Sequence, residues 1–310
     1  MNILLTGTTG FIGSALIPHL LAAGHQLKVL VRNPQKAAIL PREVGIVMGD
    51  PTQPGPWRQE VAAAQAIINL TGASILTRWS PAAKQSIQTS RIIATRLLVD
   101  AMLSATGSGP KTLINASAAG YYGLKDDTDK EEDAEAGDDF LAQVCVNWER
   151  EAFKAKQHGH RVVTTRLGVV LGRGGGALAK MLPAFRWGLG GRIGSGRQPF
   201  PWIHLDDLTA IFAFLLKHPE IAGPVNCAAP QAINNKEFTL AMGQALRRPT
   251  VLPVPDFILR LLLGEMSTVL LNGVNIIPAV LKKHGFIFTF PRIDQALDHL
   301  MTASRFMVEK

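Results

Sequence analysis

Short runs rich in Val, Ile and Leu recur along the first part of the chain, and segments long enough for a helix separate most of them. This spacing is typical of repeated strand–helix–strand units, whose strands are parallel. The runs are nearly continuous rather than alternating, as expected when helices cover both faces of a sheet. The sequence therefore predicts an α/β fold with a Rossmann-like, doubly wound parallel sheet. The runs span residues 3–6, 26–32, 44–49, 66–71, 112–117 and 162–171.

Segments with a helix pattern lie between the strand-like runs, and this alternation of strands and helices ends after about residue 172. Helices are predicted over 14–23, 81–104 and 140–157, with Gly24 and Gly159 as stops. A glycine-rich basic stretch follows, then a helix near 205–218 and a strand-like run at 224–228. The remainder is predicted to be mostly helical. We expect a smaller, discontinuous C-terminal domain. The predicted division is a nucleotide-binding domain of residues 1–172, to which strand 224–229 returns, and a second domain of residues 173–223 and 230–310.

Composition excludes several classes of protein. The chain has 310 residues, of which 47% are hydrophobic, so it can bury a large core and is not intrinsically disordered. Its net charge of +8 would suit nucleic acid, a membrane surface or an anionic small molecule. No helix-turn-helix or zinc pattern is present, so we expect no nucleic-acid partner. The most apolar stretch, 257–281, is interrupted by charged residues and Pro278, and is interpreted as buried helices without membrane contact.

Cysteine usage and the first residues indicate the cellular compartment. Cys145 and Cys227 cannot form a disulfide framework, and neither has a Cys or His at metal-ligand spacing. The N-terminal residues reach Gly7 after one short apolar run, without the basic and apolar regions of a signal peptide. We therefore expect a cytoplasmic protein without a metal.

The first strand-like run leads directly into a glycine-rich turn, and a helix pattern follows it. Gly7 permits a tight turn, Gly10 lets the backbone approach a pyrophosphate, and Gly13 permits close helix packing. The diphosphate would lie at the helix N-terminus, where N–H groups and the helix dipole favour an anion. The context between a strand and a helix favours this over an ordinary turn. The predicted contacts in the turn are Gly7, Thr9, Gly10, Phe11, Ile12 and Gly13.

The ends of the next strands supply the remaining cofactor candidates. Val31 and Arg32 end the second run about 20 residues beyond the turn, where an Asp or Glu meets NAD and an Arg suits the 2′-phosphate of NADP. A solvated strand-end charge is the alternative for Arg32. Asp50 could accept from the adenine amino group or simply form a turn. The fourth strand should end facing the pyrophosphate and the nicotinamide ribose, with Asn69, Leu70, Thr71 and Gly72.

Motifs along the whole chain resemble the extended short-chain dehydrogenase/reductase superfamily. They are residues 6–13, 69–72, 117–123, 166–172 and 202–208. The segments 172–176, 194–196 and 200–204 are similar to an atypical branch called epimerase family proteins. Some members of that branch have been labelled cell-division inhibitors, and they carry a short C-terminal domain like residues 286–300 here.

The resemblance implies a catalytic Tyr and a Lys four residues later on one helix face, which this chain lacks. With Glu149 as the reference, Leu141 and Cys145 stand at the Tyr and Lys positions. Ser117 and Tyr122 remain as catalytic candidates; Tyr121 and Lys125 have the spacing but lie outside a helix pattern. Cys145 is interpreted as a core residue rather than a nucleophile. On the cofactor side the resemblance implies Arg91, Arg166 and Leu167.

Charge is distributed unevenly around these motifs. Between Glu151 and Asp206 all charged residues are basic, which predicts an anion site or an ordinary basic surface. The mostly acidic run 126–139 is expected to form a solvated loop near the substrate. His204 precedes a helix pattern that Asp206 or Asp207 is expected to cap.

Two functions follow from these observations. The first is an NADP(H)-binding oxidoreductase or epimerase that acts by hydride transfer on an unidentified small substrate, anionic or sugar-like. The alternative is a non-catalytic NADPH-binding sensor or regulatory protein that lacks the Tyr/Lys pair. Neither involves nucleic acid or a membrane, and self-association into a homo-oligomer stays open.

Overall fold

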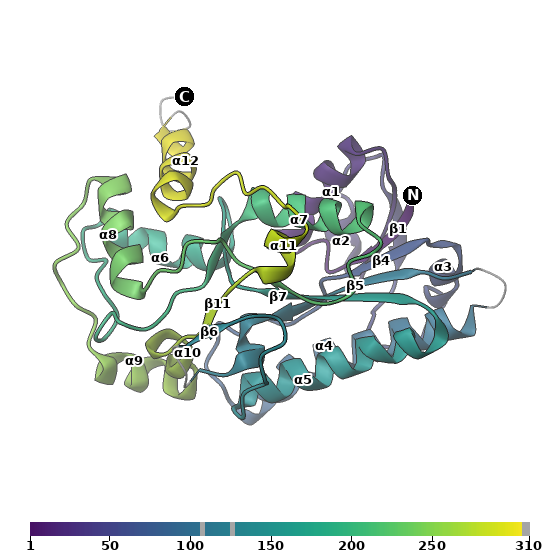
Figure 1. The fold of residues 1–310 in the computed structure, drawn as a ribbon, viewed down its shortest axis with the longest axis horizontal. Coiled ribbons are helices and arrows are strands. Elements are labelled where there is room, and N and C mark those ends of the chain that lie inside the picture. Colours follow the sequence, from purple (N-terminus) through teal and green to yellow (C-terminus); the bar gives the residue numbers. More distant parts are fainter. Residues whose placement is uncertain (106–108, 125–127, 306–310) are drawn as a thin grey trace.

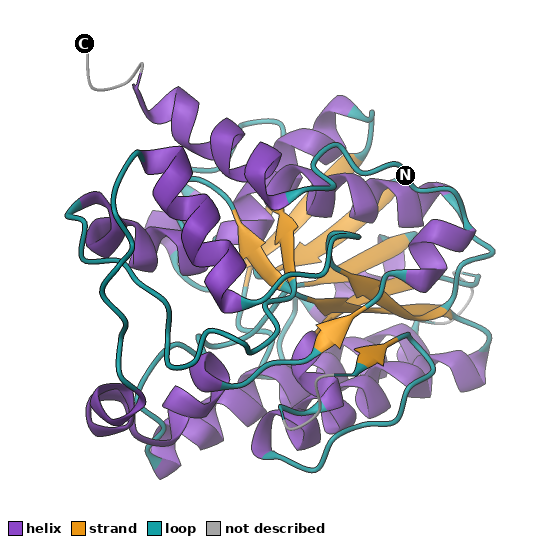
Figure 2. Cartoon of the chain, turned by 60° about the vertical axis from the view of Figure 1, so that its left-hand side comes forward, coloured by secondary structure: helices purple, strands orange, loops and turns teal. Residues whose placement is uncertain are grey.

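A parallel sheet forms the centre of the computed structural model, which describes residues 1–105, 109–124 and 128–305. Its strands are β1 (Asn2–Thr6), β2 (Gln26–Val31), β3 (Gly45–Met48), β4 (Ala66–Asn69), β5 (Thr112–Ala118), β7 (Arg161–Leu167) and β10 (Gly223–Cys227). All pairs are parallel, in the order β10-β7-β5-β4-β1-β2-β3 (Figure 1, Figure 2). This confirms the predicted fold class. The strand order reverses between β1 and β4, the place where such sheets bind ligands at their carboxyl ends.

Helices cover both faces of the sheet (Figure 1). The helices packed on one face are α1 (Phe11–Ala22), α7 (Leu205–Lys217) and α11 (Ala279–Lys283). Those packed on the other are α3 (Arg58–Ala63), α4 (Pro81–Ser104), α5 (Phe140–Phe153) and η2 (Lys154–His158). A short helix, α2 (Pro34–Ala37), follows β2. Ser80 caps α4 through its hydroxyl, and Pro81 occupies the first turn, so the sequence predicts this helix with its observed limits.

The C-terminal part has its own hydrophobic core, built from buried side chains that include Leu178, Trp202, Phe238 and Leu297. It comprises α6 (Gly176–Arg186), α8 (Asn235–Leu246), α12 (Ile293–Arg305) and the paired strands β8 (Val169–Leu171) and β9 (Trp202–His204). The predicted domain limits stay a prediction; α7, from the segment expected in the second domain, shares the core of the sheet.

The run 162–171 is not one strand, as predicted, but two. The chain leaves the central sheet at Gly168, and β8 pairs with β9 instead. A Cβ at Gly168 would lie 3.0 Å from the backbone oxygen of Pro201, so glycine permits the close approach of the two segments. The apolar run continues through the bend because both strands are covered by other elements. Hydrophobic periodicity alone therefore does not reveal the bend.

The stretch 257–281 also differs from its prediction. It forms α9 (Asp256–Leu263), η3 (Gly264–Met266), α10 (Ser267–Leu271) and β11 (Asn275–Ile276), which pairs with β6 (Asp129–Lys130). Met266, Ile276 and Leu281 are buried, but α9 contains no buried residue. The expectation of buried helices is therefore wrong for α9. Among the helices of the described residues, none has the length and apolarity needed to cross a membrane.

Candidate functional site

The glycine-rich turn between β1 and α1 is built by close backbone contacts. Gly7 has a φ of +71°, and a Cβ there would lie 2.5 Å from the backbone carbonyl of Leu70. A Cβ at Gly13 would lie 2.5 Å from Cα of Thr8, within the turn itself. Both positions therefore require glycine for the fold. The buried hydroxyl of Thr8 has no hydrogen-bond partner among the described residues.

Gly10 differs, because the protein crowds it less closely and a pocket opens beside it. It is the N-cap of α1, its φ is −87°, and a Cβ there would meet only the oxygen of Gly7, at 3.2 Å. A pocket of about 400 Å³ opens over the turn and the start of α1. Its lining includes the predicted residues Thr9, Gly10 and Phe11, together with Ser14, Ala15, Arg173, Gly174 and Leu205.

The sequence reasoning missed the second group of lining residues. The signal was the glycine-rich segment 172–176, because a Cβ at Gly172, Gly175 or Gly176 would lie within 3 Å of the Phe11 ring. Because they have no side chains, these glycines let the segment pack directly against the Phe11 ring. The ring and the segment together close one side of the pocket. Ile12, Val31 and Leu167, also predicted as cofactor contacts, direct their side chains into or against the core of the sheet.

A buried hydrogen-bond network links the carboxyl ends of β1, β4 and β5. Thr6 Oγ1 donates to Asn69 Oδ1 at 2.6 Å, and Thr71 Oγ1 donates to Thr6 Oγ1 at 2.8 Å. Asn69 Nδ2 donates to Thr95 Oγ1 and to Asn115 Oδ1. The Asn69 side chain is thus committed to positioning β1, β4 and β5, whereas the half-exposed Thr71 lies beside the glycine turn.

Arg32 and Asp50 lie together at the ends of β2 and β3. Arg32 Nη1 is 3.6 Å from Asp50 Oδ2, and the Arg32 side chain is 70% exposed. Asp50 Oδ1 accepts from the backbone N–H and the hydroxyl of Thr52. Partial burial raises the pKa of Asp50, but these hydrogen bonds and Arg32 outweigh it and hold the pKa below its usual value. An exposed guanidinium therefore stands at the strand end expected to meet the 2′-phosphate.

The two catalytic candidates belong to a buried polar cluster around Arg166. Arg166 Nε and Nη2 each lie 2.9 Å from a different carboxylate oxygen of Glu149, a bidentate pair. Ser117 Oγ donates to Glu149 Oε1 at 2.6 Å. Tyr122 Oη accepts from Arg166 Nη1 and donates to Asn226 Oδ1, both at 2.8 Å. Arg166 is thus held by the protein rather than directed at a cofactor.

This geometry weakens the catalytic assignment of Ser117 and Tyr122, which stays a prediction. Burial raises the pKa of Tyr122 to about 12, even with Arg166 beside it. A phenolate base is therefore disfavoured at neutral pH. Burial likewise raises the pKa of Cys145 to about 12, so this thiol is a core residue, as predicted. Lys125 lies outside the described residues, so the pair with Tyr121 has no structural description.

Arg91 lies against the end of β4. Its guanidinium carbon would be 3.0 Å from a Cβ at Gly72, and it lies 5.3 Å from the centre of the Trp148 ring. Nη1 donates to the carbonyl oxygen of Ile87, and burial lowers the pKa of Arg91. Gly72 therefore leaves room for this cation beside the segment expected to face the nicotinamide ribose.

Comparison with known proteins gives the family. Residues 3–228 match the NAD dependent epimerase/dehydratase family, and residues 254–300 match a domain of unknown function, DUF1731. The chain belongs to the NAD dependent epimerase/dehydratase family. The expected resemblance to epimerase family proteins with a short C-terminal domain is confirmed.

Relatives match nearly the full length of this family member. It is 41% identical to the chloroplastic homolog of epimerase family protein SDR39U1 from Arabidopsis thaliana, over 97% of this chain and 87% of that one. It is 42% identical to epimerase family protein Mb2239 of Mycobacterium bovis, over 96% and 97%. The crystal structure of human SDR39U1 with NADPH has a TM-score of 0.85 and 34% identity, covering 97% of this chain and 99% of that one.

The basic stretch of this epimerase-family chain does not gather into one anion site. Arg161 donates to the carbonyl oxygens of Leu215, His218 and Ile221 at the end of α7 and beyond it. Arg173 donates to those of His299 and Leu300 in α12. Lys180 reaches Leu76, while Arg166 and Lys154 pair with glutamates. These five cations join elements of the fold, whereas four others of the stretch are exposed: Lys156, Arg186, Arg192 and Arg197.

The described part of the acidic run is mostly an exposed loop, as expected, but two of its carboxylates are held by the protein. Within its described part, residues 128–139, Glu132 is 7% exposed and its Oε1 accepts from the N–H groups of Asn226 and Val280. Burial raises the pKa of Glu132. Asp139 caps α5 through its carboxylate. This segment therefore ties β10 to the region that follows β11.

His204 itself caps α7, in place of the expected Asp206 or Asp207. Its Nδ1 accepts from the N–H of Asp206 at 3.0 Å, and its Nε2 lies 3.2 Å from Nδ1 of His299. His204, Asp206 and His299 lie close enough to resemble a metal site, but both nitrogens of His204 are engaged. Asp207 accepts from the N–H groups of Thr289 and Phe290 and so anchors the segment before α12.

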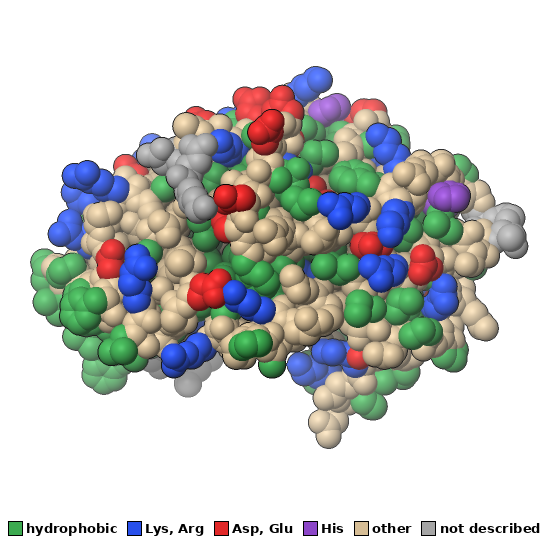
Figure 3. Space-filling model, turned by 90° about the horizontal axis from the view of Figure 1, so that it is seen from below, with side chains coloured by type: hydrophobic (Ala, Val, Ile, Leu, Met, Phe, Trp, Pro, Cys, Tyr) green, Lys and Arg blue, Asp and Glu red, His purple; other side chains and the backbone are tan. Residues whose placement is uncertain are grey.

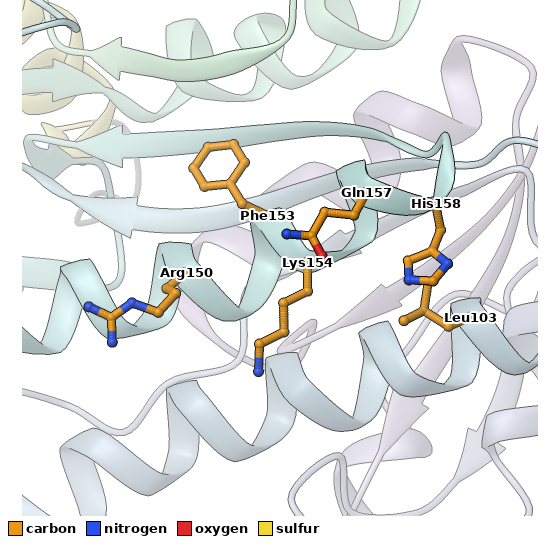
Figure 4. Close-up of a pocket in the computed structure, with 6 residues that line it drawn as sticks. All are labelled: Leu103, Arg150, Phe153, Lys154, Gln157 and His158. Carbon is orange, nitrogen blue, oxygen red and sulfur yellow. The ribbon is translucent and has the colours of Figure 1, made fainter.

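A second pocket, of about 560 Å³, lies at the opposite ends of the strands (Figure 4). Leu103, Arg150, Phe153, Lys154, Gln157 and His158 line it. It lies where α4 ends and where η2 leads into β7, at the amino ends of β5 and β7. Sheets of this kind bind their ligands at the carboxyl ends, so this hollow does not belong to the candidate site.

Proposed function

We propose that the chain binds NADP(H) across the carboxyl ends of β1, β2 and β4. The observation that carries this proposal is the glycine turn: the protein packs against Gly7 and Gly13 but crowds Gly10 less closely, beside a pocket at the N-terminus of α1. The residues fit the cofactor, because an anion is favoured at this helix end and the guanidinium of Arg32 is exposed, with Asp50 3.6 Å away. The NADPH in the structure of human SDR39U1 supports the assignment.

Each part of the cofactor would contact a different group of residues in this site. N–H groups at the start of α1 would hold the diphosphate, Arg32 the 2′-phosphate, and the segment of Thr71 and Gly72 the ribose of the nicotinamide. The bound cofactor would supply or accept a hydride. Phe11, covered by the segment 172–176, would exclude water from one side of the diphosphate.

Calorimetric titration with NADPH and NADH in parallel tests this proposal. We expect the wild type to bind NADPH more tightly by about tenfold or more, and Arg32→Ala to lose that preference. Arg42→Ala, which removes another exposed arginine, is the matched control. Equal affinities for the two nucleotides in the wild type would contradict the role of Arg32, and failure of both to bind would contradict the site.

We further propose that the protein is an oxidoreductase or epimerase acting by hydride transfer on a small substrate, anionic or sugar-like, in the cytoplasm. The buried positions of Ser117 and Tyr122 leave proton transfer to water or to a substrate group. The same observation favours the second candidate, a non-catalytic NADPH-binding sensor or regulatory protein.

Turnover separates these two candidates. NADPH oxidation is followed with a panel of small carbonyl compounds, for the wild type and for Tyr122→Phe. Isomerisation of nucleotide sugars is followed by chromatography with NADP⁺ present, because an epimerase returns its hydride and consumes no cofactor. Turnover of any compound above the rate without protein supports the enzyme, and unchanged turnover in Tyr122→Phe shows that this hydroxyl is structural. A nucleotide that binds but supports neither reduction nor isomerisation supports the sensor.

A further inference from the structure

The face around α9 exposes an unusual number of large apolar side chains. Six of them form what we call the apolar end face: Trp187, Leu189, Val251, Phe257, Leu261 and Leu262. Trp187 is 82% exposed, Phe257 70% and Leu261 74%. Scattered apolar residues are normal on a protein surface, but exposed aromatic rings and leucines carried by neighbouring segments mark a contact surface.

Two neighbouring segments bring these side chains together. The N–H of Val254 donates to the oxygen of Arg192, and the N–H of Gly194 donates to the oxygen of Val254. A Cβ at Gly188 would meet Pro249, so the segments also touch near Trp187 and Val251. Figure 3 shows hydrophobic side chains gathered at the left end of the molecule, where Figure 1 places α9, with Lys and Arg side chains beside them.

The charges on these segments have one dominant sign. Five exposed arginines flank the apolar end face in sequence: Arg186, Arg192, Arg247, Arg248 and Arg260. None of the salt bridges found among the described residues involves them. Asp256, and Glu265 just beyond α9, are the exposed acidic residues on this part of the chain, and Glu265 pairs with Lys84. A symmetric dimer through this face would bring arginines of one copy against those of the other, which disfavours a second copy as the partner.

We propose that the apolar end face and its arginines dock the protein on the surface of an anionic lipid bilayer. An exposed helix with Leu and Phe on its surface and arginines around it lies in the plane of a membrane interface without crossing it. The aromatic rings and leucines enter the boundary between headgroups and acyl chains, while the arginines attract anionic headgroups. This inference replaces the expectation that the protein has no membrane contact, and it does not depend on cofactor binding.

Vesicle flotation tests the proposal with the full-length protein. The vesicles contain phosphatidylcholine alone or equal parts of phosphatidylcholine and phosphatidylserine. We expect the wild type to float with the anionic vesicles, to float less as salt is added, and to stay behind with phosphatidylcholine alone. Binding of the wild type to neither kind of vesicle would overturn the proposal.

Two pairs of variants locate the contact. Phe257→Ser with Leu261→Ser should reduce partition onto anionic vesicles by about tenfold or more, because both side chains are exposed and removing them leaves the core intact. Arg248→Glu with Arg260→Glu should also reduce it and weaken its dependence on salt. The matched controls Ile39→Ser and Arg42→Glu, exposed changes after α2, should leave it unchanged.

Sedimentation velocity of the same variants distinguishes other partners. A wild type that stays monomeric while binding vesicles agrees with the proposal. A wild-type dimer that Phe257→Ser with Leu261→Ser converts to a monomer, without vesicle binding, would assign the face to self-association and overturn the proposal. Equal flotation of the wild type and both patch variants would place membrane binding elsewhere on the surface.

Discussion

Replacing Arg166 by Met tests whether this arginine supports the fold or holds the cofactor. The Arg166 side chain is 4% exposed and that of its partner Glu149 is 5% exposed. Arg166 also donates to Tyr122 Oη and to the carbonyl oxygen of Glu132, at 2.8 and 2.9 Å. Met fills much of the same space but donates no hydrogen bond.

The expected loss of stability comes from the Glu149 carboxylate, which stays buried after its cation is removed. In Arg166→Met the Glu149 carboxylate keeps the hydroxyl of Ser117 but loses its bidentate cation. Breaking a buried pair from one side costs about 3–5 kcal/mol, a large part of the roughly 5–15 kcal/mol that stabilises a typical fold. Removing both charges in Arg166→Met with Glu149→Leu should recover part of that loss, because no uncompensated charge remains buried.

Urea unfolding of the wild type, both single variants and the double variant gives the four free energies of unfolding. The result expected is a double variant more stable than Arg166→Met alone. A loss below about 1 kcal/mol in Arg166→Met would refute the reasoning, since it lies well under the cost of a broken buried pair. A stable Arg166→Met protein that no longer binds NADPH would show that Arg166 is part of the cofactor site.

The remaining predictions concern the turn, a buried histidine and the C-terminal anchor. Gly7→Ala should destabilise the protein by at least about 1–2 kcal/mol in urea unfolding, because φ is +71° and a Cβ would meet backbone; a neutral effect would contradict this. Burial lowers the pKa of His204 to about 4, so unfolding favours its protonated form: the free energy of unfolding should fall by roughly 2–3 kcal/mol as pH drops from 6.5 towards 4, and less in His204→Asn. An equal pH dependence in both proteins would exclude His204 as its source. Asp207→Asn leaves one acceptor for the two N–H groups of Thr289 and Phe290, and should speed hydrogen exchange in α12; unchanged exchange would show that the anchor lies elsewhere.

The sequence predicts the central sheet well, because its signals are local. Continuous apolar runs between helix-length segments indicate buried parallel strands, and all seven strands of the sheet lie at or near the expected positions. The glycine turn is predicted with its context, since Gly7, Gly10 and Gly13 meet requirements set by the neighbouring strand and helix.

Contacts between distant residues could not be predicted in this way. The pairing of Arg166 with Glu149 and the burial of Tyr122 depend on β7, α5 and β10 meeting in space. The apolar sequence of α9 reads like a core helix, because a pattern of Leu and Phe does not reveal whether another element covers it. Likewise, the single run 162–171 hides a change of sheet at Gly168.

NADPH titration of Gly10→Ala tests the central claim, that this glycine turn holds the nucleotide. A Cβ at Gly10 would lie 3.2 Å from the oxygen of Gly7, a tight contact that needs a shift of a few tenths of an ångström, so the variant should fold and melt much like Gly45→Ala, a control whose methyl group meets the side chain of Lys28 at the same distance. We expect Gly10→Ala to lose about tenfold or more in NADPH affinity, because the methyl group stands where a diphosphate must approach the backbone. A folded Gly10→Ala protein that binds NADPH as tightly as the wild type and Gly45→Ala would contradict the claim.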